Sequence, residues 1–281
     1  MNSKKVILFP SDFSESARCA MKYGLQLYAG RGYKYILLNT VEPSGSSSSA
    51  GMMLNMSEIM TKDSLEGLAR DKKWLESQPE AEGCEFETVQ MFGEFTACVK
   101  HLIKQKPIVG IIMGTTGASG LKEFFVGSNA AAVIQDIQLP TLTVPYNSQF
   151  NGISRIVYAT DLNILKDYSF LAPIKEIAIK RNAKLSILHV VKKTSKISPE
   201  NKEIARQNLR DYFGETNPSF ETIENNDTVE GIYDYMEQNK DADIIIMVPR
   251  KKNFFEKIFS KSVAKKVAHH SSIPMITLQS S

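Results

Sequence analysis

Short runs of apolar residues alternate with amphipathic stretches along the whole chain. In the first half such runs lie within residues 4–12, 35–41 and 108–113, and the stretches between them carry apolar residues at helical spacing. A run without polar alternation is typical of a parallel strand covered by helices on both faces. Residues 84–91 alternate instead, which indicates a strand nearer the edge of the sheet. With residues 139–145 as a fifth strand, the pattern predicts a doubly wound α/β domain.

The second half of the chain repeats the pattern of the first. Four of its segments match strands of the first half: residues 155–161, 185–191, 245–247 and 273–278. The match places Asp161 opposite Asp12, at the end of the opening strand of each repeat. We therefore expect an α/β protein of two tandem doubly wound domains, residues 1–147 and 153–281, joined by a polar linker.

Composition excludes several classes of protein. The chain has 281 residues and a net charge of +3, which is too small to argue for DNA or RNA as a partner. No apolar run approaches the roughly 20 residues that span a bilayer, so we expect no membrane segment. The first residues lead directly into a strand without the features of a secretory signal. Three scattered cysteines and four histidines show no metal-ligand spacing, so we expect no metal site in the protein itself and a cytoplasmic location.

A strand, a glycine-containing loop and a helix follow one another within residues 111–137. The apolar run ends at Gly114, Gly117 follows in the loop, and a helical pattern begins at Gly127 and Ser128. Glycine lets the backbone come close to a ligand, and the N–H groups at a helix N-terminus favour an anion. The spacing is neither that of a P-loop nor that of a dinucleotide-binding loop. It predicts a phosphate-binding loop; turn glycines with Ser128 as an ordinary helix cap are the alternative.

The opening strand ends at Asp12. In an open α/β sheet the carboxyl end of this strand lies where the strand order reverses, so Asp12 is expected to point into a ligand crevice. Asp12 and Glu15 as a capping box, or Ser14 as the helix cap, are structural alternatives that need no ligand. The second strand leads into the serine-rich residues 44–51, which predict either a mobile lid over the crevice or a passive linker.

Two motifs together resemble the universal stress protein family: residues 7–17, Ile-Leu-Phe-Pro-Ser-Asp-Phe-Ser-Glu-Ser-Ala, and the spacing Gly114-x2-Gly117-x9-Gly127-Ser128. The resemblance covers essentially the whole chain. It implies a five-stranded parallel sheet of order 3-2-1-4-5 in each repeat, with ATP and Mg2+ in the first. The nucleotide contacts that it implies are Pro10, Asp12, Val41, Met113, Gly114, Gly117, Gly127, Ser128 and Asn129.

The resemblance also implies what each contact does. Pro10 and Asp12 would flank the adenine and ribose, Val41 would offer backbone groups to the base, and Met113 would line the pocket. The glycines, Ser128 and Asn129 would hold the ribose and phosphates.

The second repeat departs from the motif. At the equivalent positions it has Val248, Lys251 and Lys261 in place of the three glycines, and only Ser262 keeps its type. Valine and lysine do not allow the close backbone approach that glycine does. We therefore expect one ATP site per chain, in the first repeat.

Three functions follow as hypotheses. The first is an ATP-binding regulator or sensor of the stress response, little or not catalytic, that changes how the chain docks to a protein partner whose identity the sequence does not give. The second is a slow ATPase, for which Lys122, Glu123 and Glu94 are the nearby candidates. The third is an interaction scaffold without a nucleotide.

Residues 250–266 carry seven basic residues against one acidic, interleaved with aromatics. They predict either a segment that binds an anion, a membrane surface or RNA, or a segment whose aromatic residues pack into the fold while its lysines face solvent. Because single domains of the family commonly dimerise, the two repeats are expected to form a pseudo-dimer within one chain. A homodimer of chains is the alternative.

Overall fold

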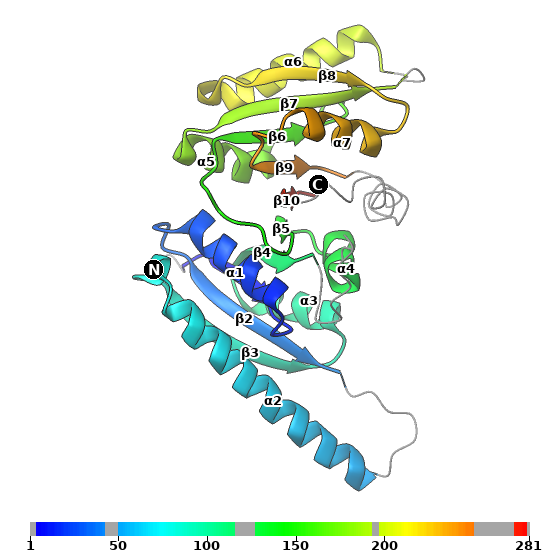
Figure 1. The fold of residues 1–281 in the computed structure, drawn as a ribbon. Coiled ribbons are helices and arrows are strands. Elements are labelled where there is room, and N and C mark those ends of the chain that lie inside the picture. The colour runs from blue at the N-terminus through cyan, green and yellow to red at the C-terminus, as the bar shows by residue number, and fades with distance from the viewer. Residues whose placement is uncertain (1–3, 43–49, 116–126, 193–196, 250–272, 280–281) are drawn as a thin grey trace. The chain divides into compact units, whose positions relative to one another are not determined.

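The computed structural model describes residues 4–42, 50–115, 127–192, 197–249 and 273–279 (Figure 1). These residues form two compact units, and the chain passes from one to the other between Gln149 and Phe150. We call them unit 1 and unit 2. The boundary lies inside the stretch that the sequence analysis assigns to the linker.

Five parallel strands form the sheet of unit 1. Their bounds are β1 Val6–Pro10, β2 Lys34–Val41, β3 Glu85–Phe92, β4 Ile108–Gly114 and β5 Thr141–Val144. The strand pairs give the order β3-β2-β1-β4-β5, and every pair is parallel. This confirms the order expected for the first repeat. β1 is buried along its whole length, as its apolar run predicts, whereas β3 is half-exposed.

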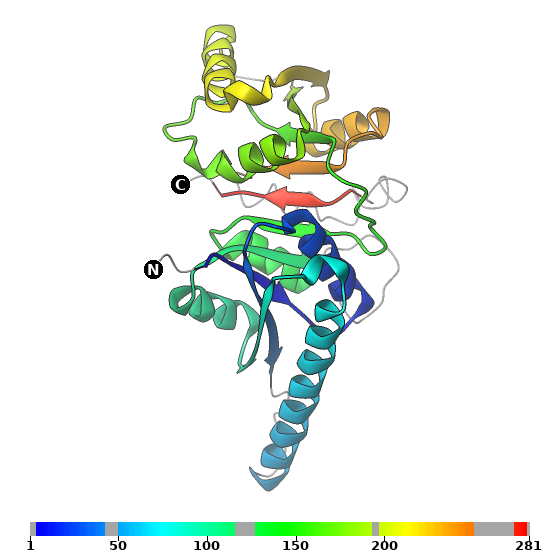
Figure 2. The ribbon, with the colours of Figure 1, turned by 90° about the vertical axis from the view of Figure 1, so that its left-hand side faces the viewer.

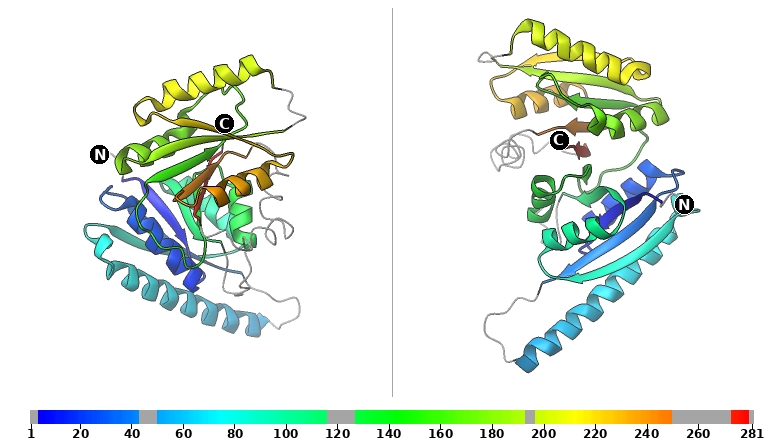
Figure 3. Two further views of the ribbon diagram at one scale, coloured as in Figure 1. Left: turned by 45° about the horizontal axis from the view of Figure 1, so that its top comes forward. Right: turned by 180° about the vertical axis from the view of Figure 1, so that it is seen from behind.

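Four helices of the described residues cover the two faces of this sheet. They are α1 Glu15–Tyr28, α2 Ala50–Glu76, α3 Phe95–Gln105 and α4 Ser128–Asp136, with a short 3-10 turn at Pro79–Ala81. α1 and α2 contact each other on one face, while α3 and α4 contact each other on the opposite face (Figure 3). Beneath α3 and α4, buried apolar side chains of β1, β2 and β4 form one core cluster with those of the helices. Burial of this kind is the main favourable term in folding.

α2 is much longer than the other helices of the unit. It has 27 residues, which at 1.5 Å per residue is roughly 40 Å. Its first half extends beyond the ends of the strands (Figure 2). The serine-rich segment that precedes it, including the predicted lid at residues 44–49, lies outside the described residues. Among the described helices, α2 included, none combines the length and apolar character of a membrane span.

Unit 2 has the same strand order. Its strands are β6 Arg155–Ala159, β7 Lys184–Val191, β8 Ser219–Glu224, β9 Ile244–Met247 and β10 Met275–Thr277. The described pairs are all parallel and give β8-β7-β6-β9-β10. Its helices are α5 Ala172–Arg181, α6 Pro199–Phe213 and α7 Thr228–Gln238, and short 3-10 turns lie at Ser169–Leu171 and Gly214–Thr216. The basic segment and the positions of Lys251, Lys261 and Ser262 lie outside the described residues.

Candidate functional site

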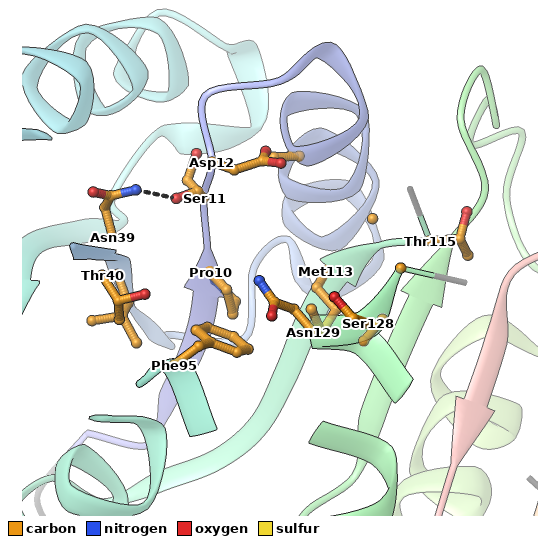
Figure 4. A pocket seen from close by; sticks show the side chains of 15 residues that line it. Pro10, Ser11, Asp12, Asn39, Thr40, Phe95, Met113, Thr115, Ser128 and Asn129 are labelled. Carbon is orange, nitrogen blue, oxygen red and sulfur yellow. Dashed lines mark hydrogen bonds between the residues drawn. The ribbon is translucent and has the colours of Figure 1, made fainter. Parts of the chain in front are cut away.

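A cavity opens at the carboxyl ends of the central strands of unit 1. Its volume is about 220 Å³, and β1, β2, β4 and the first residues of α3 and α4 line it (Figure 4). At this edge of the sheet the chain leaves the neighbouring strands β1 and β4 toward opposite faces, to α1 and α4, which is the usual ligand position in an open α/β sheet. Its lining residues are Pro10, Ser11, Asp12, Ala17, Leu38, Asn39, Thr40, Phe95, Met113, Gly114, Thr115, Gly127, Ser128, Asn129 and Ala130.

Seven of the nine residues proposed from the sequence line this cavity. They are Pro10, Asp12, Met113, Gly114, Gly127, Ser128 and Asn129. Val41 is buried near the end of β2 without lining it, and its carbonyl accepts a hydrogen bond from the N–H of Gly93 at 3.0 Å. Gly117 lies outside the described residues. The sequence thus brings strand β1 and helix α4 together at one site, as their motifs predicted.

The turn after β1 fixes the direction of Asp12. Phe13 adopts a left-handed backbone conformation with φ +65°, and its N–H donates to the Ser11 hydroxyl oxygen at 3.1 Å. Ser14 is the N-cap of α1 and accepts from the N–H of Ala17, so of the two capping alternatives the serine cap is the one present. Asp12 accepts from the N–H of Ser14 at 3.1 Å and remains exposed at the rim of the cavity. Its carboxylate can therefore both order the turn and face a ligand.

Gly114 is held in close contact with helix α1. A Cβ at this position would lie 2.9 Å from the backbone carbonyl oxygen of Ser16, closer than real Cβ atoms come to a backbone atom. The absence of a side chain thus lets the first turn of α1 pack against the end of β4. Ala17, one residue further along α1, lines the cavity because of this approach. Gly114 has a packing role in addition to the ligand role inferred from its spacing.

The first turn of α4 faces the cavity without a side-chain cap. Gly127 is the N-cap, and no side chain of the described residues accepts a hydrogen bond there. Ser128 and Asn129, the first two helical residues, are exposed and line the cavity. In contrast, Ser14 caps α1 and Glu94 caps α3. N–H groups at an open helix N-terminus favour an anion.

Eight of the lining residues are not among the contacts proposed from the sequence, and three of them have side chains that bear on the ligand: Asn39, Thr40 and Phe95. Asn39 donates to the carbonyl oxygen of Ser11 at 2.8 Å and accepts from the Ser64 hydroxyl of α2 at 2.6 Å. Figure 4 shows Thr40, Phe95 and Pro10 around one end of the cavity, with Ser128 and Asn129 across from them. A polar residue inside the apolar run 35–41 was a signal for Asn39. The sequence gives no such signal for Phe95, because an aromatic residue at the start of a helix usually belongs to the hydrophobic core.

The described residues give little evidence for a metal site or for a nucleophilic side chain. Within the described ranges, no three His, Cys, Asp or Glu side chains gather as metal ligands. Burial raises the pKa of the thiols of Cys19, Cys84 and Cys98, so they stay protonated at neutral pH. Glu94, one ATPase candidate, accepts from the N–H groups of Thr96 and Ala97, and these bonds lower its pKa. Lys122 and Glu123 lie outside the described residues.

Two comparisons place this architecture among known proteins. The model of the universal stress protein family matches residues 4–145 and 152–279, which confirms the predicted tandem repeat. A universal stress protein of Methanocaldococcus jannaschii is 27% identical over 146 residues, which are 51% of this chain and 83% of that protein.

Two solved structures that match nearly the whole chain have the same fold. A universal stress protein from Archaeoglobus fulgidus DSM 4304 superposes with a TM-score of 0.67 over 98% of both chains, at 18% identity. A functionally unknown protein from Pseudomonas aeruginosa PAO1 superposes with a TM-score of 0.56 at 12% identity, over 99% of this chain and 93% of that one. A universal stress protein described in complex with cAMP aligns with 51% of this chain and 98% of its own, with a TM-score of 0.38 and 18% identity.

Proposed function

Because this chain belongs to the universal stress protein family, we propose that it is an ATP-binding regulator or sensor of the stress response. One ATP binds in the cavity of unit 1, and its occupancy alters how the chain meets a protein partner. The observation that carries the proposal is the cavity itself. It combines apolar side chains at one end, the Asp12 carboxylate at the rim and the open N-terminus of α4 across from them.

The apolar end suits the adenine. Pro10, Met113 and Phe95 supply apolar surface, and the Phe95 ring offers a face on which a purine can stack. Thr40, at the same end, contributes a hydroxyl for the polar edge of the base. Asp12 is placed to accept hydrogen bonds from ribose hydroxyls. Val41 and Gly117 remain parts of the proposed site that follow from the family resemblance.

The triphosphate would lie at the first turn of α4. Gly127 permits close approach, and Ser128 and Asn129 add side-chain donors to the N–H groups of the turn. Mg2+ bound to nucleotides usually takes most of its ligands from phosphates and water, with one or two carboxylates at most. Asp12 is the one carboxylate lining the described cavity. The residues present therefore fit a nucleotide that brings its own metal ion.

A regulator is favoured over an enzyme. Hydrolysis needs a group that orients the attacking water and a cation that stabilises the transferred charge. Glu94 is engaged as the cap of α3, so it is a poor water-orienting base. A slow ATPase that uses Lys122 or Glu123 would show as phosphate release by the purified chain.

The substitution Ser128→Glu tests the proposal. A carboxylate in the first turn stabilises α4 through its interaction with the helix dipole, so the fold is preserved. The same charge would face the phosphates: at about 4 Å and an effective dielectric constant of about 20 the repulsion is roughly 4 kcal/mol per charge. Salt and solvent at this exposed position reduce it to about 1.5–3 kcal/mol. We expect ATP affinity, measured by isothermal titration with Mg2+, to fall roughly ten- to hundredfold.

Ser128→Gln is the matched control, because it removes the hydroxyl and adds bulk without charge. It is expected to retain most of the ATP affinity. Titrations with ADP, AMP and cAMP on the wild-type chain rank the nucleotides. If the wild-type chain binds no adenine nucleotide after removal of any copurified ligand, or if the Glu and Gln variants bind ATP equally, the proposed site is refuted and the scaffold hypothesis takes its place.

A further inference from the structure

Unit 2 keeps a cavity at the place where the nucleotide motif is lost. It lies at the carboxyl ends of β6, β7 and β9, beside the first turn of α7, and its volume is about 360 Å³. Small-molecule sites have volumes of about 300–1,000 Å³. Its lining residues are Tyr158, Ala159, Thr160, Asp161, Asn163, Leu188, Val190, Lys192, Thr228, Ile232, Met247, Val248 and Pro249.

The backbone turn that presents the carboxylate is the same in both units. Leu162 follows Asp161 with φ +53°, and its N–H donates to the Thr160 hydroxyl oxygen at 3.2 Å. Asp161 accepts from the N–H of Asn163 at 3.2 Å through Oδ1 and from the Asn163 side-chain amide at 2.5 Å through Oδ2. A bulky residue in the left-handed region is unfavourable by about 1–3 kcal/mol, and such strain persists where the surrounding structure holds the residue, as it does here for the buried Leu162 side chain. Unit 2 has kept this turn although the glycines are gone.

The surroundings of the turn have become more apolar. Val190 occupies the strand position that Thr40 has in unit 1, and Val248 and Pro249 stand where unit 1 has Gly114 and Thr115. The cavity has also gained width, because Thr228 replaces the larger Phe95 at the first helical residue of α7.

The helix after the turn begins later in unit 2. α1 starts at Glu15, three residues after Asp12, whereas α5 starts at Ala172, eleven residues after Asp161. A valine is accommodated at position 248, where unit 1 requires glycine because of Ser16. As a result no residue of α5 lines the described cavity, while Ala17 of α1 lines that of unit 1.

The charges of the wall are balanced. Asp161 is an acceptor at the end of β6, and Lys192 is a donor just after β7, where the equivalent residue of unit 1 is Glu42. Thr160, Asn163 and Thr228 add groups that donate and accept hydrogen bonds. Val248 stands where unit 1 has Gly114, so the end of β9 lacks the glycine that would let its backbone come close to phosphates. A neutral ring compound with donors and acceptors on its edge matches the described part of the wall.

We propose that the cavity of unit 2 binds a neutral, nucleoside-like ring compound without phosphates, with its donors directed at Asp161. The chain then carries two small-molecule sites of different selectivity, one for a charged nucleotide and one for an uncharged ligand. The site in unit 2 stands independently of ATP binding in unit 1, since it is formed by residues of unit 2 alone.

Methionine methyl NMR on the full chain separates the two sites, because Met247 lines the cavity of unit 2 and Met113 lines that of unit 1. Both resonances are assigned by Met→Leu substitution. Adenosine and ATP serve as probes. We expect adenosine to shift the Met247 methyl resonance with saturation, and ATP to leave it unshifted at the same concentration.

Asp161→Asn keeps the size of the side chain and an oxygen for the turn, and removes the charge. It is expected to weaken adenosine binding at Met247 about tenfold, as for loss of a hydrogen bond to a charged group. Asp211→Asn, an exposed carboxylate of α6, is the matched control and should leave the affinity unchanged. The proposal is overturned if millimolar adenosine does not shift the Met247 methyl resonance, or if ATP shifts it equally. It is also overturned if Asp161→Asn leaves the adenosine affinity unchanged. Failure of ATP binding in unit 1 would appear separately, at Met113.

Discussion

A buried carboxylate joins the wall of the unit 1 cavity to helix α2. Asp71 of α2 has no exposed surface, and it accepts from the Ser11 hydroxyl at 2.7 Å and from Nε of Arg18 at 2.9 Å. Ser11 lines the cavity, and Arg18 lies on α1. The three residues therefore fasten two helices to the end of β1. We predict that Asp71→Ala and Asp71→Asn destabilise unit 1 strongly.

The magnitude follows from the partners. Hydrogen bonds to a charged group contribute about 1.5–3 kcal/mol each, and breaking a buried ion pair typically costs about 3–5 kcal/mol. The Arg18 side chain is 30% exposed and also lies 3.5 Å from Glu15, so it keeps solvent and a second partner when Asp71 is removed. We therefore expect roughly 3 kcal/mol for Asp71→Ala and roughly 2 kcal/mol for Asp71→Asn, which retains one acceptor oxygen. Ser11→Ala removes a single hydrogen bond and should cost about 1 kcal/mol.

Urea unfolding followed by tryptophan fluorescence measures these differences. Trp74 is the single tryptophan of the chain and lies on α2, three residues from Asp71. With a urea dependence of about 2 kcal/mol per molar, the midpoint of the Asp71→Ala variant should fall by roughly 1.5 M. If Asp71→Asn leaves the midpoint unchanged, or Ser11→Ala lowers it as far as Asp71→Ala does, the reasoning about this buried group is wrong.

Two further predictions concern one residue in each unit. Burial lowers the pKa of His189 in the folded state, and the positive charges of Lys202 and Arg206 lower it further, whereas the Thr160 carbonyl and Asp161 act in the opposite direction. As the pH falls below the ordinary histidine pKa of about 6.5, the unfolded state therefore binds more protons than the folded state. The contribution of neutral His189 to the stability of unit 2, followed by far-UV circular dichroism, should therefore be fully present above that pH and be lost below it. Stability should then decrease more steeply with falling pH than in His189→Gln, and the same pH dependence in both proteins would contradict this. Gly114→Ala places a methyl group against the Ser16 carbonyl and should destabilise unit 1 by about 1–3 kcal/mol. Val248→Ala, at the equivalent position of unit 2, should destabilise its unit less. Urea midpoints measure both changes, and an equal or larger loss for Val248→Ala would refute the prediction.

The fold was predictable because its signal is repeated along the chain. The uninterrupted apolar run of β1 and the alternating pattern of β3 indicated a central and an edge strand, and the pairs of unit 1 place them so. The match between the repeats then located four strands of unit 2, β6, β7, β9 and β10, but not β8. The spacing of apolar residues indicates which face of a strand or helix is buried, and the burial of these faces determines how strands and helices pack in layers.

The site was predictable only where one residue type is required by local chemistry. Asp12 at the end of a buried strand and Ser128 at a helix start were both found, since each position has a characteristic sequence context. Asn39 and Phe95 reach the cavity through tertiary packing. The close approach of Gly114 to Ser16 is a contact between distant segments, and nothing in the loop spacing distinguishes it from a ligand requirement.

The two units line the cavity at the same place in the fold with different residues. Both keep a strand that ends in a hydroxyl residue and an aspartate, followed by a left-handed residue bonded back to that hydroxyl. What differs is the position at which the next helix begins. In unit 1, α1 begins three residues after Asp12, so its first turn reaches the cavity and packs against Gly114. In unit 2, α5 begins eleven residues after Asp161, and a valine can occupy position 248. The absence of this glycine from unit 2 fits the different ligand that we propose for its cavity, and the shared turn places an aspartate in the wall of both cavities.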